Sequence, residues 1–241
     1  MNHMNKIVTK SLDLLFPPAC PLCGNILGAN EKYVCAECGS KISYIVPPVC
    51  LRCGKEIEDE DIEYCSDCSE HSRSYIRGFP AINYEEPVKS GVAAFKYHNR
   101  RDGAAYFAYE IAKRQGKAIL DVAPDVLVPV PVHRTKKLKR GYNQAELLAN
   151  ELGKRLCIPV DRKILCRSSN TMPQKKLDPE ARERNLKQAF VATDRNVKYN
   201  SVMLVDDIYT TGATIEACSA ALHSKGIKNV YYTSICIGKG Y

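Results

Sequence analysis

Residues 202–214 read V-M-L-V-D-D-I-Y-T-T-G-A-T and predict a buried strand, a turn and the start of a helix. Val202 to Val205 form an unbroken apolar run, which is typical of a strand covered on both faces of a parallel sheet. Asp206 and Asp207 follow at the carboxyl end of this strand. Thr210 to Thr214 are small and rich in hydroxyl groups, and an apolar helical pattern comes after them. The stretch therefore predicts an α/β fold in which one strand delivers two carboxylates to a tight turn.

Such a turn suits a phosphorylated sugar. Backbone N–H groups at a helix N-terminus attract a phosphate, and glycine lets the backbone approach it closely. Paired carboxylates accept hydrogen bonds from neighbouring sugar hydroxyls, and ligands of open α/β sheets bind beyond the carboxyl ends of the strands. An ordinary buried strand with a Thr/Gly turn is the alternative, which the number of features in register disfavours. The expected sugar ligands are Asp206 and Asp207, and the expected phosphate ligands are Thr210, Thr211, Gly212, Ala213 and Thr214.

Residues 202–214 resemble the ribose-phosphate-binding motif of the type I phosphoribosyltransferases. The resemblance implies that the two acids hold the ribose hydroxyls of phosphoribosyl pyrophosphate (PRPP), and that the Thr/Gly loop holds its 5-phosphate. It also implies Mg²⁺ bound with PRPP, and a twisted, mainly parallel sheet with helices on both faces. The G-x-x-x-x-G-K-[ST] pattern of P-loop proteins is absent.

Eight of the 12 cysteines fall within residues 20–68 as four C-x-x-C pairs, whose first cysteines recur every 15 residues. One such turn points two sulfurs at a cation, and two turns complete a tetrahedral zinc site. Redox-active dithiols are the weaker alternative. Pairing successive turns gives two structural zinc ribbons, and a cross-braced pairing stays open. The expected zinc ligands are Cys20, Cys23, Cys35, Cys38, Cys50, Cys53, Cys65 and Cys68.

Charge divides the chain near residue 72. Residues 1–72 hold 6 Lys/Arg and 11 Asp/Glu, whereas residues 73–241 hold 29 and 16. We expect an N-terminal helix with a double zinc-ribbon module over 1–72 and a phosphoribosyltransferase-like domain over 73–241. The acidic module is a poor ligand for duplex DNA, whereas the basic domain attracts polyanions. No apolar run reaches membrane-spanning length and residues 7–16 make a poor signal peptide, so we expect a cytoplasmic protein without membrane insertion.

A second anion site is predicted after the strand Asp125 to Val130. A basic loop follows this strand, and Gly141-Tyr142-Asn143-Gln144 then opens a helix. The stretch 129–145 resembles the ComF family (competence protein F, also called ComFC), through its R-G-Y-N-Q-A signature. Polar residues 167–190 resemble the loop with which that family covers its active site. The resemblance assigns the pyrophosphate to His133, Arg134 and Arg140, and implies a role in DNA uptake during natural transformation.

Further elements are expected from apolar patterns. Strands are predicted at 76–84, 158–166 and 229–237, and helices at 7–16, 86–97 and 104–117. A polar cluster after the second of these helices is either a solvated helix end or a contact near the substrate: Lys96, Tyr97, Asn99, Arg100 and Arg101. The four cysteines outside the C-x-x-C pairs are expected to be buried: Cys157, Cys166, Cys218 and Cys236.

Together these features predict a Mg²⁺-dependent enzyme that transfers a phosphoribosyl group from PRPP to an acceptor which the sequence does not identify. Asp206, Asp207 and Arg140 are the expected catalytic residues. A PRPP-sensing protein without turnover is one alternative. A handler of single-stranded DNA is another, with a basic face made of Arg100, Arg101, the run from Lys136 to Arg140, Lys175 and Lys176.

Overall fold

A four-stranded parallel sheet forms the centre of the molecule. The computed structural model describes residues 17–168, 189–193 and 199–238. The sheet has the order β1 (Gly78–Asn83), β6 (Asn229–Ile237), β5 (Ser201–Tyr209) and β2 (Val126–Pro129), and all three strand pairs are parallel. The carboxyl ends of its strands therefore meet at one edge, where a ligand of such a fold binds.

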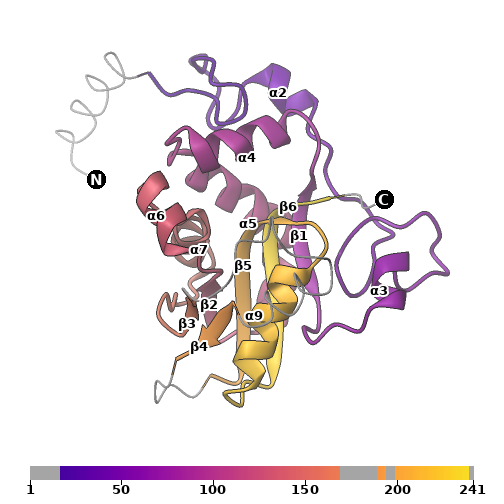
Figure 1. Cartoon of the computed structure of the whole chain (residues 1–241). Coiled ribbons are helices and arrows are strands. Elements are labelled where there is room, and N and C mark those ends of the chain that lie inside the picture. Colours follow the sequence, from indigo (N-terminus) through magenta and orange to yellow (C-terminus); the bar gives the residue numbers. More distant parts are fainter. Residues whose placement is uncertain (1–16, 169–188, 194–198, 239–241) are drawn as a thin grey trace, which may run out of the picture.

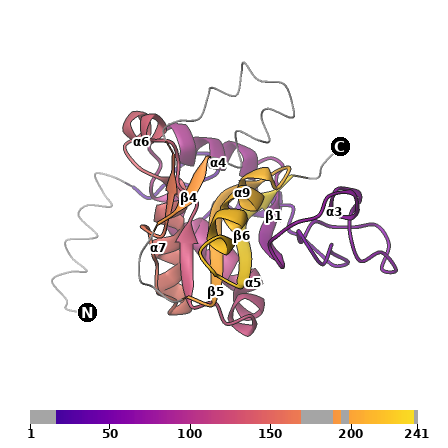
Figure 2. The same ribbon diagram turned by 60° about the horizontal axis from the view of Figure 1, so that its bottom comes forward.

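Helices cover both faces of this sheet (Figures 1 and 2). One face carries α4 (Val88–Tyr97), α5 (Gly103–Asp121) and α7 (Gln144–Leu156), and the other carries α9 (Ala213–His223). In β5, Met203 and Val205 pack with the first group, whereas Val202 and Leu204 pack with α9. This alternation follows from the two-residue period of a strand, and it confirms the predicted strand buried on both faces.

A small antiparallel sheet lies on the α9 side. Its strands are β3 (Leu165–Arg167) and β4 (Phe190–Ala192). The strand predicted over 158–166 is thus wrong for most of its length. The Asp161 carboxylate accepts hydrogen bonds from the N–H groups of Lys163 and Ile164 at 2.8 and 3.2 Å, and this side-chain turn interrupts the extended chain.

The other expected elements agree with the structure at the level of their type. The predicted strands at 76–84, 125–130 and 229–237 correspond to β1, β2 and β6, and the helices at 86–97 and 104–117 to α4 and α5. The basic run after β2 is a helix, α6 (Arg134–Arg140), and not the loop that we expected. The expected helix at 7–16 and most of the 167–190 connection lie outside the described residues.

Two metal-binding lobes precede the sheet. The first includes α2 (Ala36–Ser40) and lies against α4, and the second includes α3 (Ser66–Glu70) and lies beside β1 (Figure 1). Leu22 packs so closely on α4 that a Cβ on Gly91 would lie 2.5 Å from its Cδ2. A hydrogen bond joins the second lobe to the sheet: the hydroxyl of Tyr232 in β6 donates to the carbonyl of Cys53 at 2.7 Å. Both lobes therefore share apolar cores with the rest of the molecule.

Two of the four single cysteines are not where we expected them. Cys218 and Cys236 are buried as predicted, whereas Cys157 and Cys166 are exposed. Cys157 caps the end of α7 with a left-handed backbone, φ 57°, which ends the helix at the surface. Cys166 occupies the outward-facing middle position of β3. The apolar residues next to Cys157 and Cys166 in the sequence therefore did not predict the exposure of these two side chains.

Of the helices in the described part of the chain, none combines the length and the apolar composition needed to cross a lipid bilayer.

Candidate functional site

The two acids lie in the second half of β5. Asp206 pairs with Ser234 of β6, and the strand continues beyond the predicted apolar run to Tyr209, so both carboxylates lie inside the strand, near the carboxyl end where we expected them. Successive side chains of a strand point to opposite faces. Asp207 accordingly meets Lys96 of α4, whereas Asp206 lies near Arg167 of β3 on the α9 side.

Lys96 is the direct partner of Asp207. Its Nζ lies 2.8 Å from Asp207 Oδ1, and the two side chains are only 19% and 13% exposed. Burial alone lowers the pKa of Lys96, but the contact with Asp207 outweighs burial and the pKa is raised. The short contact between these two mostly buried side chains is a charge-assisted hydrogen bond.

Asp206 has no such partner among the described residues. Its Oδ1 accepts a hydrogen bond from the N–H of Asp207 at 2.8 Å. Burial, followed by the neighbouring charge of Asp207, raises the pKa of Asp206 to about 7. A buried acid with a raised pKa is common at functional sites.

Replacing Asp206 by asparagine is expected to stabilise the protein at alkaline pH. The pKa of Asp206 is about 7 in the folded state, against an ordinary value of 3.8 in the unfolded chain, so the wild type loses stability as pH rises between these values. The stability advantage of Asp206→Asn should therefore grow by about 3 kcal/mol between pH 5 and pH 8, at about 1.4 kcal/mol per pKa unit. Urea unfolding of both proteins at the two pH values measures it. A difference that does not change with pH would contradict the raised pKa.

The hydroxyl-rich turn follows at once. Thr210 and Thr211 are exposed, and Gly212 has φ +75° immediately before α9. A Cβ at Gly212 would lie 2.2 Å from the hydroxyl oxygen of Tyr209, so only glycine fits this backbone. The turn presents the N-terminal amides of an 11-residue helix next to the two acids.

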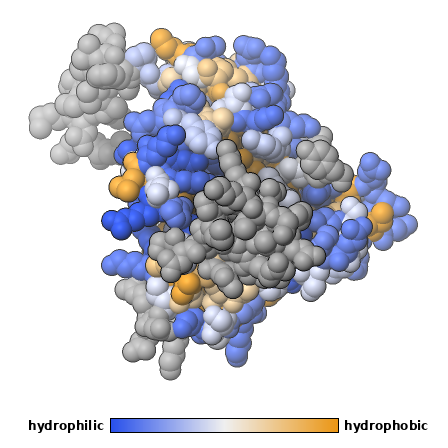
Figure 3. Space-filling view, in the orientation of Figure 1, coloured by the Kyte–Doolittle hydropathy of each residue, from blue (hydrophilic) through white to orange (hydrophobic). Residues whose placement is uncertain are grey.

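A basic cavity opens on the α4 side of the acids. It has a volume of about 590 Å³ and lies between the end of α4 and α6. On the face shown in Figure 3, strongly hydrophilic residues gather over α6 and beside it. The cavity is lined by Lys96, Tyr97, Asn99, Arg101, Lys136, Leu138, Lys139, Arg140 and Gly141.

The expected pyrophosphate residues do not all reach this cavity. Arg140 lines it, with its guanidinium 4.7 Å from the ring centre of Tyr97 and Nη1 donating to Gln144 Oε1 at 2.9 Å. His133 instead caps α6, where its Nδ1 accepts from the N–H of Thr135, and Arg134 is exposed. The lining therefore includes one of the three side chains to which the sequence assigned the pyrophosphate.

Three cations near the acids received no individual role from the sequence: Lys96, Lys136 and Arg167. Burial, together with Arg167, Arg140 and Lys96, lowers the pKa of Lys136, so these cations share one positive field. The sequence did contain an indication that Lys96 is partly buried, because it falls near the apolar face of α4 beside Val92 and Phe95. For Arg167, which lies in a polar stretch, no signal separated it from the other basic residues.

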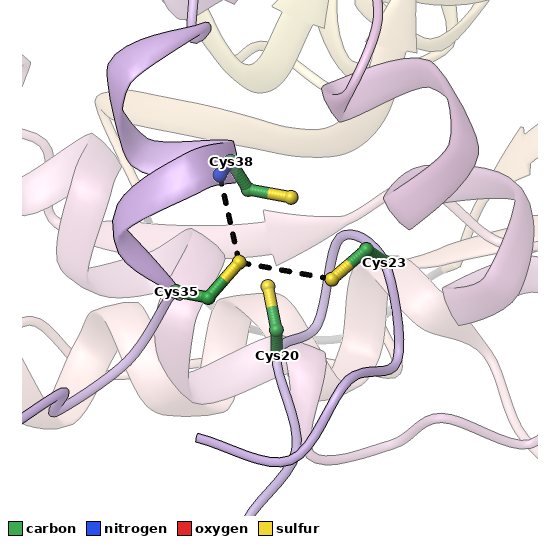
Figure 4. Close-up of side chains that lie close together, drawn as sticks. All are labelled: Cys20, Cys23, Cys35 and Cys38. Carbon is green, nitrogen blue, oxygen red and sulfur yellow. Dashed lines mark hydrogen bonds between the residues drawn. The ribbon is translucent and has the colours of Figure 1, made fainter. Parts of the chain in front are cut away.

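The four C-x-x-C turns form two groups of four sulfurs. The pairing is sequential, and in each group the sulfurs lie within 4.8 Å of one another. Figure 4 shows the sulfurs of the first group turned toward a common centre, with Cys23 and Cys35 Sγ 3.7 Å apart. A tetrahedron with Zn–S bonds of about 2.3 Å has sulfurs about 3.8 Å apart, whereas a disulfide needs about 2.05 Å. Both groups therefore fit zinc.

A protein-family model supports these N-terminal sites. The model described as "Double zinc ribbon domain" matches residues 11–69. With the parallel sheet, this match defines the class as an α/β protein that carries paired zinc ribbons before its sheet.

Curated relatives narrow the class to one family. "Competence protein F" of Haemophilus influenzae is 32% identical over 204 residues, 81% of each chain. "Competence protein ComFC" of Bacillus subtilis is 31% identical over 212 residues, 83% of this chain and 82% of its own. "DNA utilization protein YhgH" of Salmonella typhimurium is 27% identical over 92% of this chain and 98% of its own. The chain belongs to the ComF family of competence and DNA utilization proteins.

Proposed function

We propose that this chain binds PRPP together with Mg²⁺ and transfers its phosphoribosyl group to a nucleophile. The observation that supports this most is the sequence of groups at the carboxyl end of β5. Two carboxylates lead within three residues into a hydroxyl-bearing turn, and Gly212 with φ +75° places that turn at the N-terminus of α9. A ligand with vicinal hydroxyls and a terminal phosphate complements these groups in that order.

Each part of PRPP has a candidate partner in this arrangement. The ribose hydroxyls are assigned to Asp206 and Asp207, and the contact with Lys96 fixes the position of the Asp207 side chain. The 5-phosphate is assigned to the turn from Thr210 to Thr214. Its hydroxyls and backbone amides are neutral donors, which suits a phosphate that does not leave in the reaction.

The pyrophosphate is assigned to the basic cavity. Lys136 and Arg140 line it beside Lys96, and their charges would neutralise the leaving group. His133 and Arg134, at the start of the same helix, are the further candidates for contact with it. In the reaction, the bond from ribose C1 to the pyrophosphate oxygen breaks, a bond from C1 to the acceptor forms, and pyrophosphate leaves. C1 becomes positively charged on the way, as in glycoside hydrolysis.

Mg²⁺ fits the donors present. This ion is held by one or two carboxylates and by substrate phosphates, and not by an all-protein cage. Asp206, whose carboxylate has no ion-pair partner among the described residues, is the candidate on the protein side. When bound, Mg²⁺ would supply positive charge to the pyrophosphate.

Turnover is tested by pyrophosphate release. PRPP and Mg²⁺ are incubated with the protein and with nucleobases, amines or single-stranded DNA as acceptors. If the protein is a transferase, pyrophosphate release should require both the protein and one class of acceptor. Asp206→Asn should abolish this release. Saturable PRPP binding without release under any acceptor would contradict transfer, and would leave the chain a PRPP sensor.

Single-stranded DNA handling is a second candidate function for the same surface. Tyr97 is 67% exposed at the mouth of the basic cavity, with the guanidinium of Arg140 4.7 Å from its ring centre. An exposed aromatic ring among cations can stack a base while the cations contact the backbone. If the chain has this function, single strands should bind more weakly as salt rises. A plot of the logarithm of the binding constant against the logarithm of the salt concentration should fall with a slope of about −0.7 per phosphate contact. The names of the relatives, which refer to competence and DNA utilization, fit a role of either function in the use of imported DNA.

A further inference from the structure

The segment that leaves the second metal-binding lobe runs along the proposed 5-phosphate turn. Residues 73–75 connect α3 to β1, and each of them bonds to a different part of the β5–α9 unit. Arg73 Nη2 donates to the carbonyl of Thr211 at 3.0 Å, and the N–H of Ser74 donates to Glu216 Oε2 in the first turn of α9 at 2.8 Å. The hydroxyl groups of Tyr75 and Tyr209 lie 2.7 Å apart. The connecting segment therefore contacts the last residue of β5, the turn itself and the first turn of α9.

Arg73 is the residue that ties this brace to the metal-binding lobe. The same Nη2 that donates to Thr211 also donates to Asp67 Oδ2 at 2.9 Å, so one nitrogen uses its two hydrogens to bridge two segments. Asp67 lies in α3 between the metal ligands Cys65 and Cys68. The side chain of Arg73 is 9% exposed. The arginine side chain is thus mostly buried, while Asp67 is 32% exposed and the bond to Thr211 lies at the surface, and a charge-assisted bridge with a mostly buried arginine restricts the positions of both segments.

We propose that Arg73 is a positioning residue that transmits the fold of the second zinc ribbon, through Asp67, to the turn at Thr211. Its bond to the Thr211 carbonyl holds the peptide that precedes Gly212. The orientation of that peptide decides where the following amides point. The inference rests on the proposed function only for the identity of the ligand, because the bridge itself is present in the free protein.

Amide hydrogen exchange of the ligand-free protein tests the bridge without any ligand. Arg73→Gln and Asp67→Asn are compared with Arg155→Gln. Arg155 is the matched control, since it donates to the carbonyl of Ala105 and contacts the Tyr33 ring, on the α5–α7 side of the sheet. We expect faster exchange over residues 209–216 in the two test variants and wild-type exchange in the control, with zinc content unchanged in all three. Unchanged exchange over 209–216 in Arg73→Gln would overturn the proposal.

Ligand-binding measurements then test the positioning role of Arg73 and the proposed PRPP site independently of each other. Calorimetry with ribose 5-phosphate and with pyrophosphate should show about tenfold weaker binding of the first to Arg73→Gln, as for loss of one charge-assisted hydrogen bond. Pyrophosphate affinity should not change. The double variant with Asp67→Asn should bind ribose 5-phosphate no more weakly than Arg73→Gln alone, because both act through one bridge. Equal weakening of both ligands would overturn the positioning role, whereas a wild type that binds neither ligand would contradict the proposed function and leave the exchange result standing.

Discussion

The double variant Asp206→Ala/Asp207→Ala is expected to lose PRPP binding by more than about 100-fold. Each carboxylate would make at least one hydrogen bond to a ribose hydroxyl, and hydrogen bonds that involve a charged group contribute about 1.5–3 kcal/mol each. The two together correspond to roughly two to four powers of ten in the dissociation constant. Calorimetric titration with PRPP and Mg²⁺ measures the loss.

Asp207→Ala removes the partner of Lys96 and should lower the stability, but the fold and the metal content should survive. The acids lie at the end of β5, beyond the core residues that hold its apolar part between the helices. Asp125→Asn is the matched control, because Asp125 lies at the other end of the strand pair and accepts from the N–H groups of Asn200 and Ser201. It should bind PRPP like the wild type. Unchanged affinity in the double variant, with native circular dichroism, would refute the assignment of the ribose.

Cys53→Ser is expected to remove one zinc per chain and to cost more than about 4 kcal/mol of folding stability, the range found when a structural metal is lost. Cys53 is fully buried, its Sγ lies 3.6 Å from that of Cys65, and its carbonyl accepts from the hydroxyl of Tyr232. The ring of Tyr232 stacks on that of Tyr209 at a centroid distance of 4.8 Å. Loss of the metal should therefore destabilise the packing of the sheet as well as the second ribbon.

Metal analysis and urea unfolding test this expectation. Cys166→Ser is the control, because Cys166 is exposed and belongs to neither tetracysteine group. It should keep two zinc ions and change stability by less than about 0.5 kcal/mol, as for an ordinary surface substitution. Two zinc ions retained by Cys53→Ser would contradict the ligand assignment for the second ribbon.

The sequence predicted the parts of the structure that depend on local patterns. The apolar run at Val202 to Val205 predicted the central strand, because a strand buried on both faces needs no polar alternation. The 15-residue recurrence of the C-x-x-C turns predicted both metal sites, and the structure selects the sequential pairing over the cross-braced one.

Contacts between distant segments could not be predicted. Lys96 and Asp207 are far apart along the chain, and their ion pair exists only because α4 packs against the face of the sheet to which Asp207 points. The bridge from Asp67 through Arg73 to Thr211 likewise needs the second lobe to dock beside α9. The helix α6 was missed for a local reason. A run of like charges favours a solvated loop, but the caps supplied by His133 and Gly141 stabilise a helix there.

A phosphorylated sugar is expected to bind at the carboxyl end of β5, and a crystal structure of the complex with PRPP and Mg²⁺ tests this placement most directly. We expect the ribose hydroxyls on Asp206 and Asp207, the 5-phosphate on the amides and hydroxyls from Thr210 to Thr214, and the pyrophosphate in the cavity beside Lys136 and Arg140. PRPP bound elsewhere, or contacting the basic cavity but not the two acids, would contradict it.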